Sequence, residues 1–204
     1  MRAVQRAVTI LTLALAIAGC GGPGHRSSST LSLPNDYRPI PAGRGPAYRL
    51  PALSARAALG LPINNMACTR QRHRRSYAVH VEVYARGLVV PIPSGIGVAP
   101  PVKRSGAYVN RGRCAFPIRT LDPTGLVLVD RDGHFTIGGL FAIWGKQLSL
   151  TQLAGFNGPV FAYVDGHHWI GSPALIPLRP HSQIVLEADG YVPPHPSYTF
   201  PPGL

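Results

Sequence analysis

Residues 77–85 read YAVHVEVYA, and this stretch decides the fold class because its residues alternate over nine positions. Successive side chains of a β-strand point to opposite faces of a sheet. The odd-numbered positions are all apolar or aromatic, whereas the even-numbered ones include His80, Glu82 and Tyr84. We therefore predict a strand with one face in the core and a polar row on its solvent-facing side.

Shorter patterns extend from this strand toward the C-terminus. Leu140, Phe141 and Trp144 fall at helical spacing and predict a short helix over residues 139–144. Alternation and turn residues predict strands over 88–92 and 183–188, a hairpin joining 126–129 to 135–137, and a hairpin joining 160–164 to 169–170. The sequence thus predicts an α+β fold, predominantly β: a single domain of mixed hairpins with one short helix, over residues 61–204.

The N-terminus has the zones of an export signal. Arg2 and Arg6 precede an apolar run over residues 7–18, which is too short for a permanent membrane span. Ile17-Ala18-Gly19-Cys20 then resembles the lipobox of bacterial lipoproteins. The resemblance implies a signal peptide over residues 1–19, cleavage before Cys20, lipid attachment on that cysteine, and a location in the cell envelope outside the cytoplasm. Two or three acyl chains anchor a protein far more firmly than one.

Residues 20–60 are rich in Gly, Pro, Ser and Arg and show little periodicity. Such a composition cannot bury enough apolar surface to offset the entropy of ordering, so we predict a lipidated tether. A weak helical turn around residues 52–59 is the competing interpretation.

The three cysteines fit an exported chain. Lipidation would consume Cys20 and leave Cys68 and Cys114 as a pair in a compartment where disulfides persist. We therefore predict a Cys68–Cys114 disulfide, with two buried thiols as the alternative.

The chain is strongly basic, with 20 Lys and Arg against 8 Asp and Glu. Removing residues 1–19 takes away two arginines and leaves 18 − 8 = +10. Arg70, Arg72, Arg74 and Arg75 form the densest cluster, which is either an anion-binding patch or a solvated loop. Anionic envelope polymers and phospholipid headgroups are the expected partners, along with the membrane itself. Nucleic acid is not expected, because an exported protein rarely meets it and aromatic residues do not interleave the cluster.

Several ordered segments resemble a group of exported bacterial proteins with a histidine-rich first strand and a Gly-x-Phe-Phe-x-Ile-Trp-Gly segment. The segments that carry the resemblance are Cys68 with residues 80–87, residues 93–97, Cys114 with residues 120–125, residues 135–145 and residues 198–204. Where that group has His-Thr-His-Asp, this chain has Arg119-Thr120-Leu121-Asp122. Most of the group's histidines are therefore missing here.

His80 and Glu82 are the candidate metal ligands that remain, because imidazole and carboxylate suit zinc or copper. His134, His167 and His168 are possible third ligands. No fixed ligand spacing joins these residues, so we favour a polar strand face and predict no metal and no cofactor. The sequence also contains no Gly-x-Ser-x-Gly, P-loop or His-Glu-x-x-His motif. We therefore expect a binding or structural lipoprotein rather than an enzyme, with a metal-binding module as the alternative.

Overall fold

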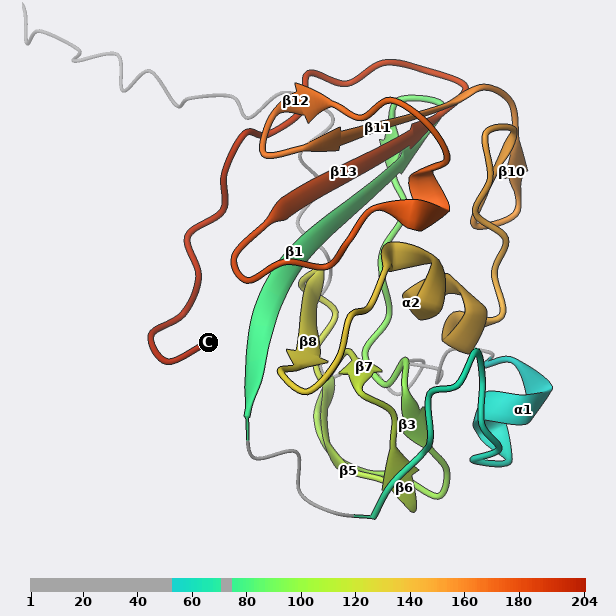
Figure 1. Ribbon diagram of the computed structural model, residues 1–204, viewed down its shortest axis with the longest axis vertical. Coiled ribbons are helices and arrows are strands. Elements are labelled where there is room, and N and C mark those ends of the chain that lie inside the picture. The colour runs from blue at the N-terminus through green and yellow to red at the C-terminus, as the bar shows by residue number, and fades with distance from the viewer. Residues whose placement is uncertain (1–52, 71–74) are drawn as a thin grey trace, which may run out of the picture. The chain divides into compact units, whose positions relative to one another are not determined.

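A computed structural model describes residues 53–70 and 75–204, and a seven-stranded sheet forms their centre (Figure 1). The long strand predicted from residues 77–85 is β1 (Ser76–Ala85), near the middle of this sheet. The order across the sheet is β12 (His167–His168), β11 (Val160–Val164), β13 (Gln183–Ala188), β1, β8 (Leu126–Asp130) and β7 (Ile118–Arg119), and β2 (Leu88–Val89) also pairs with β1. The predicted fold class, α+β and predominantly β, is confirmed.

The two strands on either side of β1 run in opposite directions to each other. β8 runs antiparallel to it, with Ser76 opposite Asp130. β13 runs parallel to it and places His80 opposite Gln183, a residue 103 positions later. A parallel pair needs a crossover connection, so most of the domain lies between these two central strands.

One of the two predicted hairpins is confirmed. β11 turns at Asp165 and Gly166, both with positive φ, and returns as β12, two residues earlier than expected. The prediction of a hairpin joining residues 126–129 to 135–137 is wrong. The edge of β8 that it required is occupied by β7, and Thr136 instead bridges to Pro177 before the chain enters a helix.

Within the described ranges, three two-stranded sheets accompany the large one. They are β3 (Val98–Ala99) with β6 (Cys114–Ala115), β4 (Lys103–Ser105) with β5 (Tyr108–Arg111), and β9 (Gln152–Leu153) with β10 (Phe156–Asn157). β3, β5 and β6 lie together at the lower end of the view in Figure 1.

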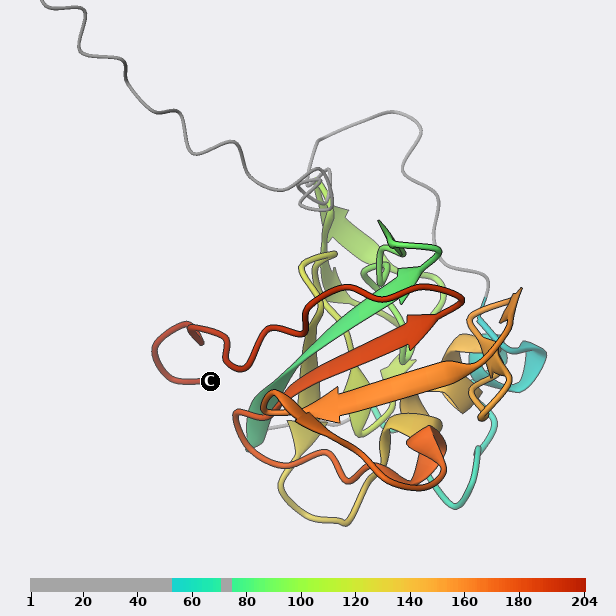
Figure 2. The same cartoon turned by 90° about the horizontal axis from the view of Figure 1, so that it is seen from above.

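The predicted short helix is α2 (Ile137–Trp144), and it packs on one face of the sheet (Figures 1 and 2). Apolar residues at helical spacing, among them Leu140, Phe141 and Trp144, are buried there. The helix ends at Gly145, where φ is 76° and a Cβ would lie 2.8 Å from the backbone nitrogen of Ser54. A 3₁₀ turn, η1 (Pro173–Leu175), packs against α2.

Packed structure begins within the range predicted as tether. The one-turn helix α1 (Ala55–Ala58) starts at Ser54, whose Oγ accepts a hydrogen bond from the Ala57 backbone, and the Ala57 side chain is fully buried. The competing interpretation of a helical turn therefore describes residues 55–58, and the folded part of the chain starts before residue 61. No helix among the described residues is long and apolar enough to cross a membrane.

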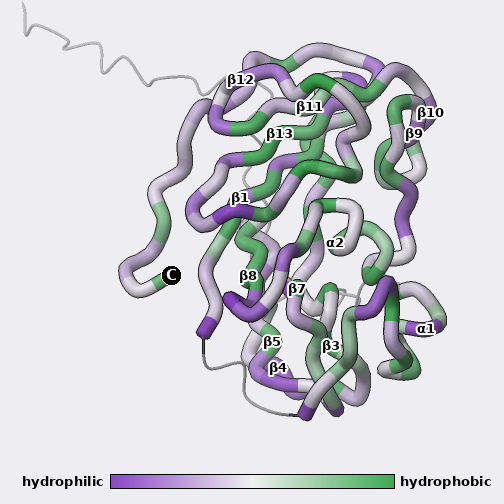
Figure 3. The backbone as a smooth tube through the Cα atoms, viewed as in Figure 1, coloured by the Kyte–Doolittle hydropathy of each residue, from purple (hydrophilic) through white to green (hydrophobic). Residues whose placement is uncertain are grey.

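The two faces of the sheet are covered by different material. The α2 face carries the main core, to which β1 contributes Val79, Val81 and Val83. The opposite face is crossed by residues 190–204, which we call the C-terminal segment; it lies on the other side of β1 and β13 from α2 (Figures 1 and 2). In Figure 3 the hydrophobic stretches concentrate in the strands of the large sheet and in α2.

Candidate binding sites

Polar residues of β1 and β13 form a row on the sheet face opposite α2. We call it the outer row, and it consists of His80, Glu82, Tyr84, Gln183 and Glu187. Strand alternation gathers these residues on one face because the residues between them, such as Val81 and Ile184, fill the core. The predicted polar face therefore exists, but its solvent exposure was wrongly predicted. His80 is only 5% exposed and Glu187 only 1%, because the C-terminal segment covers them.

His80 is engaged through both ring nitrogens. Nδ1 lies 2.7 Å from Oε1 of Gln183, and Nε2 lies 3.0 Å from the carbonyl oxygen of Thr124. The Gln183 Nε2 atom is buried and has no partner among the described residues. Two arrangements satisfy these contacts: a doubly protonated ring that donates to both oxygens, or a Gln183 amide turned so that Nε2 donates to Nδ1 of a neutral ring. In both arrangements each ring nitrogen is used.

Tyr198 and Gly125 enclose the same imidazole. The rings of His80 and Tyr198 stack with centroids 3.7 Å apart and an interplanar angle of 11°. Gly125 has φ of +84°, and a Cβ there would lie 2.5 Å from the Val81 carbonyl oxygen and 3.0 Å from Nε2 of His80. Burial raises the pKa of Tyr198, and the nearby Asp122 charge raises it further. His80 is thus packed between strand, turn and C-terminal segment.

Glu82 links the sheet to the C-terminal segment. Its Oε2 lies 2.8 Å from Nδ1 of His195 and accepts a hydrogen bond of 3.2 Å from the Tyr84 hydroxyl. Its Oε1 lies 3.9 Å from Nδ1 of His80. The side chains of Glu82 and His195 are 21% and 27% exposed, so solvent weakens their attraction only in part.

Glu187 is the most deeply buried acid of the outer row. Its Oε1 accepts a hydrogen bond of 3.2 Å from the Val192 backbone, and its Oε2 has no partner among the described residues. Burial raises the pKa of Glu187 to about 7, against the lowering effect of that hydrogen bond. Burial also raises the pKa of the neighbouring Tyr163, and the Glu187 charge raises it further. The carboxyl group therefore titrates near neutral pH.

The other candidate histidines do not join His80 and Glu82. His134 is exposed in the turn after β8, Nδ1 of His167 contacts the Asp165 carbonyl, and the ring of His168 packs 5.5 Å from that of Tyr163. Within residues 53–70 and 75–204, no three or more His, Cys, Asp or Glu side chains are grouped so that they could hold a metal ion.

The predicted disulfide is confirmed. Cys68 and Cys114 are joined by an S–S bond of 2.05 Å, with their Cα atoms 5.4 Å apart. Thr69 and Ala115 add a reciprocal pair of backbone hydrogen bonds of 2.9 Å beside it. The Arg113 guanidinium donates a hydrogen bond to the Ala58 carbonyl, so the end of α1 is held next to the disulfide. Cys20, the predicted lipid attachment site, lies outside the described residues.

Of the predicted arginine patch, the structure describes Arg70 and Arg75, both exposed; Arg72 and Arg74 lie outside the described residues. The fold brings further cations toward these two. The backbone of Arg131 donates to the carbonyl of Arg75, and Arg113 precedes the cysteine that is bonded to Cys68. Arg111 lies two residues before Arg113 and stands opposite Lys103 in the β4–β5 hairpin. We call these exposed cations the basic end: Arg70, Arg75, Lys103, Arg111, Arg113 and Arg131.

Charge is divided unevenly along the sequence from residue 53 to residue 204. Residues 53–120 contain eleven Lys and Arg and one acid, giving 11 − 1 = +10, whereas residues 121–204 contain three and six, giving 3 − 6 = −3. Two ion pairs partly join the halves, Arg86 with Asp189 at 3.2 Å and Arg119 with Asp130 at 2.7 Å. The excess positive charge therefore belongs to the half of the chain that supplies five of the six cations of the basic end.

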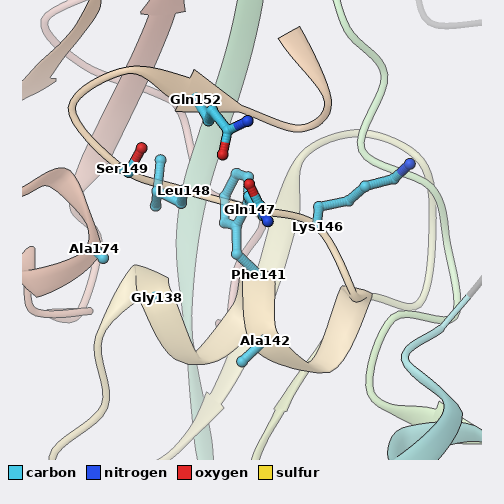
Figure 4. Close-up of a pocket in the computed structure, with 9 residues that line it drawn as sticks. All are labelled: Gly138, Phe141, Ala142, Lys146, Gln147, Leu148, Ser149, Gln152 and Ala174. Carbon is cyan, nitrogen blue, oxygen red and sulfur yellow. The ribbon is translucent and has the colours of Figure 1, made fainter. Parts of the chain in front are cut away.

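A shallow pocket of about 330 Å³ opens beside α2 (Figure 4). Its wall is formed by α2, the following loop, β9 and η1, with the residues Gly138, Phe141, Ala142, Lys146, Gln147, Leu148, Ser149, Gln152 and Ala174. Lys146 extends away from the side chains of Gln147 and Gln152 in this view. This lining contains no acidic or imidazole side chain, so it supplies no acid–base pair.

Sequence reasoning missed the residues that complete the outer row. Gln183 and Glu187 alternate with core residues in a strand that was predicted, so their common face could have been found. His195 and Tyr198 lie among prolines without periodicity, and no local signal ties them to β1. Comparison of the chain with protein-family models, curated proteins and solved structures gives no match. The resemblances to lipoproteins and to the histidine-rich group therefore stay predictions.

Proposed function

We propose that the chain is a lipid-anchored protein of the bacterial cell envelope whose β-rich domain works by binding rather than by catalysis. One observation carries the proposal. The disulfide uses Cys68 and Cys114, so the cysteine left over is Cys20, at the end of the predicted lipobox. This cysteine usage is what a lipidated chain in an oxidising compartment requires.

The described sites support binding or structural work over catalysis. The His80 imidazole has both nitrogens in hydrogen bonds and one ring face against Tyr198, so it does not present a free base to a substrate. The pocket beside α2 offers neutral hydrogen-bonding groups and one lysine. The excess positive charge of residues 53–120 suits anionic partners of the envelope.

Metal binding through His80 and Glu82 is the alternative, and one observation favours it: His195 lies beside Glu82. As they stand, these three side chains are not grouped so that they could hold a metal ion. For this site to form, His80 would have to release Gln183 or Thr124. We expect the purified mature protein to contain no stoichiometric zinc or copper. About one equivalent of metal that is lost in His80→Ala would establish the alternative.

The anchor is tested by Cys20→Ala in the full chain, expressed in bacteria fed a radiolabelled fatty acid. We expect the wild type to incorporate label and to shorten by the signal peptide, and Cys20→Ala to do neither. The double variant Cys68→Ala/Cys114→Ala is the matched control, because it removes the other two thiols and leaves the lipobox intact. Label in Cys20→Ala, or its loss in the double variant alone, would contradict the anchor.

A further inference from the structure

We infer that the basic end docks on the anionic phospholipid headgroups of the membrane that carries the chain's lipid anchor. The inference rests on the proposed anchoring and names the surface that faces the lipid. It begins from the β4–β5 hairpin, where Lys103 stands directly opposite Arg111 in the antiparallel register and both side chains are exposed. Like charges placed directly across a strand pair repel each other, and an anion beside both removes that cost.

Arg104, between them in sequence, behaves differently. It is partly buried, and its guanidinium donates to the carbonyl and hydroxyl oxygens of Ser94 at 3.3 and 2.9 Å. In this hairpin the Arg104 side chain therefore packs inward against Ser94, whereas the side chains of Lys103 and Arg111 are exposed to solvent. Among the described residues, neither Lys103 nor Arg111 has a carboxylate partner.

The other exposed cations of the basic end are also without ion pairs in the described part of the chain. The ion pairs found there bind Arg86 and Arg119 instead, so Arg70, Arg75 and Arg131 keep their charge available. Asp132 follows Arg131 in the same turn, and Asp130 is bonded to Arg119. Asp130 is therefore already paired, and the single charge of Asp132 is too small to cancel the positive charge of the basic end.

The route of the chain selects phospholipid as the occupant. The chain enters the described domain at residue 53, next to α1, and Arg113 bonds α1 to the basic end. Cys20 precedes Leu53 by 53 − 20 = 33 positions, a span of at most about 120 Å. Anchoring on the same membrane makes docking an intramolecular event at high effective concentration. Guanidinium groups pair with phosphate oxygens in a bidentate manner, and attraction to an anionic surface acts within about a Debye length.

The chain supplies its own probe, because its only two lysines are Lys103, in the basic end, and Lys146, after α2, and both are exposed. The mature lipidated protein is reconstituted into vesicles of phosphatidylcholine alone or with one-third phosphatidylglycerol. Lysine acetylation rates are then followed by peptide mass spectrometry. We expect phosphatidylglycerol to slow acetylation of Lys103 about fivefold, to leave Lys146 within about twofold, and to lose its effect in high salt.

A matched pair of charge reversals locates the effect. Arg111→Glu is expected to abolish the protection of Lys103, whereas Arg179→Glu, which makes the same charge change in the exposed loop before β13, is expected to keep it. Equal slowing of both lysines, or no slowing of Lys103 in protein that floats with the vesicles, would overturn the docking alone. Protein that fails to float overturns the anchor and the docking together. Protection of Lys103 on neutral vesicles by soluble polyphosphate, without protection by phosphatidylglycerol, would assign the surface to an anionic polymer instead.

Discussion

The two terminal parts of the described chain are attached to the rest of the fold by different means. Residues 53–70 are held by a disulfide and by paired backbone hydrogen bonds between Thr69 and Ala115. The C-terminal segment is held by side chains of the outer row: Glu187 accepts from the Val192 backbone, Glu82 contacts His195, and His80 stacks on Tyr198. The backbone–backbone hydrogen bond described within residues 190–204 is internal, from Leu204 to Pro201.

This difference follows from the sequences of the two parts. The C-terminal segment carries prolines at positions 193, 194, 196, 201 and 202, and proline has no N–H to donate to a strand ladder. A segment of this composition must be held through side chains, and two of its contacts with the outer row use acidic residues of the sheet. His181, in the loop before β13, adds contacts with the Phe200 ring and the Leu204 carbonyl. The N-terminal attachment should therefore respond to reduction, and the C-terminal attachment to pH and to changes in single side chains.

The largest expected effect comes from breaking the covalent attachment. The loop between Cys68 and Cys114 spans 46 positions, so the double variant Cys68→Ser/Cys114→Ser should lose about 3 to 4 kcal/mol of unfolding free energy through the entropy of the unfolded chain. Urea denaturation measures this loss. Thiol labelling of the denatured, unreduced wild type should find neither cysteine free. Equal stability of the oxidised and reduced protein would contradict the covalent side of the comparison.

The next effect concerns Glu187 and depends on pH. Its pKa of about 7 in the folded protein exceeds the ordinary value of 4.5, so the folded state binds the proton more tightly than the unfolded state. The stability contributed by the protonated form is complete below pH 4.5 and is lost as the pH rises through 7. Glu187→Gln keeps an oxygen for the Val192 N–H but cannot ionise. Relative to wild type, it should therefore gain up to about 3 kcal/mol between pH 4.5 and pH 8.

Denaturation of both proteins at several pH values measures that difference. Parallel stability curves for wild type and Glu187→Gln would show that Glu187 does not carry the pH response. Cys68→Ser/Cys114→Ser provides the contrasting variant, because removing the disulfide should lower the curve without changing its shape over this range. A change of shape in that variant as well would mean that the two attachments are coupled.

Patterns of nearby residues in the sequence predicted the strands and the helix that those residues form. Alternation in residues 77–85 and 183–188 located β1 and β13, helical spacing located α2, and the odd cysteine count pointed to the disulfide. The hairpin after β8 failed because β7 takes that edge, which is a non-local competition. The burial of His80 was missed for the same kind of reason. Its cover comes from Tyr198, more than a hundred positions away in a segment that has no periodicity of its own.

The smallest expected effect isolates this cover. Tyr198→Ala removes the ring stacked on His80 and should cost about 1 to 2 kcal/mol, the range of an aromatic pair together with the apolar area that it buries. Tyr198→Phe is the matched control and should stay close to wild type, because it keeps the ring and removes only the hydroxyl.

Denaturation measures the unfolding free energies, and the His80 proton resonances report on the stack itself. These resonances should shift in the alanine variant, which loses the ring current of Tyr198, and should stay near their wild-type positions in the phenylalanine variant. An equal loss of stability in the two variants would mean that the hydroxyl, rather than the stack, holds this part of the C-terminal segment. No change in either would mean that Glu82 and Glu187 hold the segment without Tyr198.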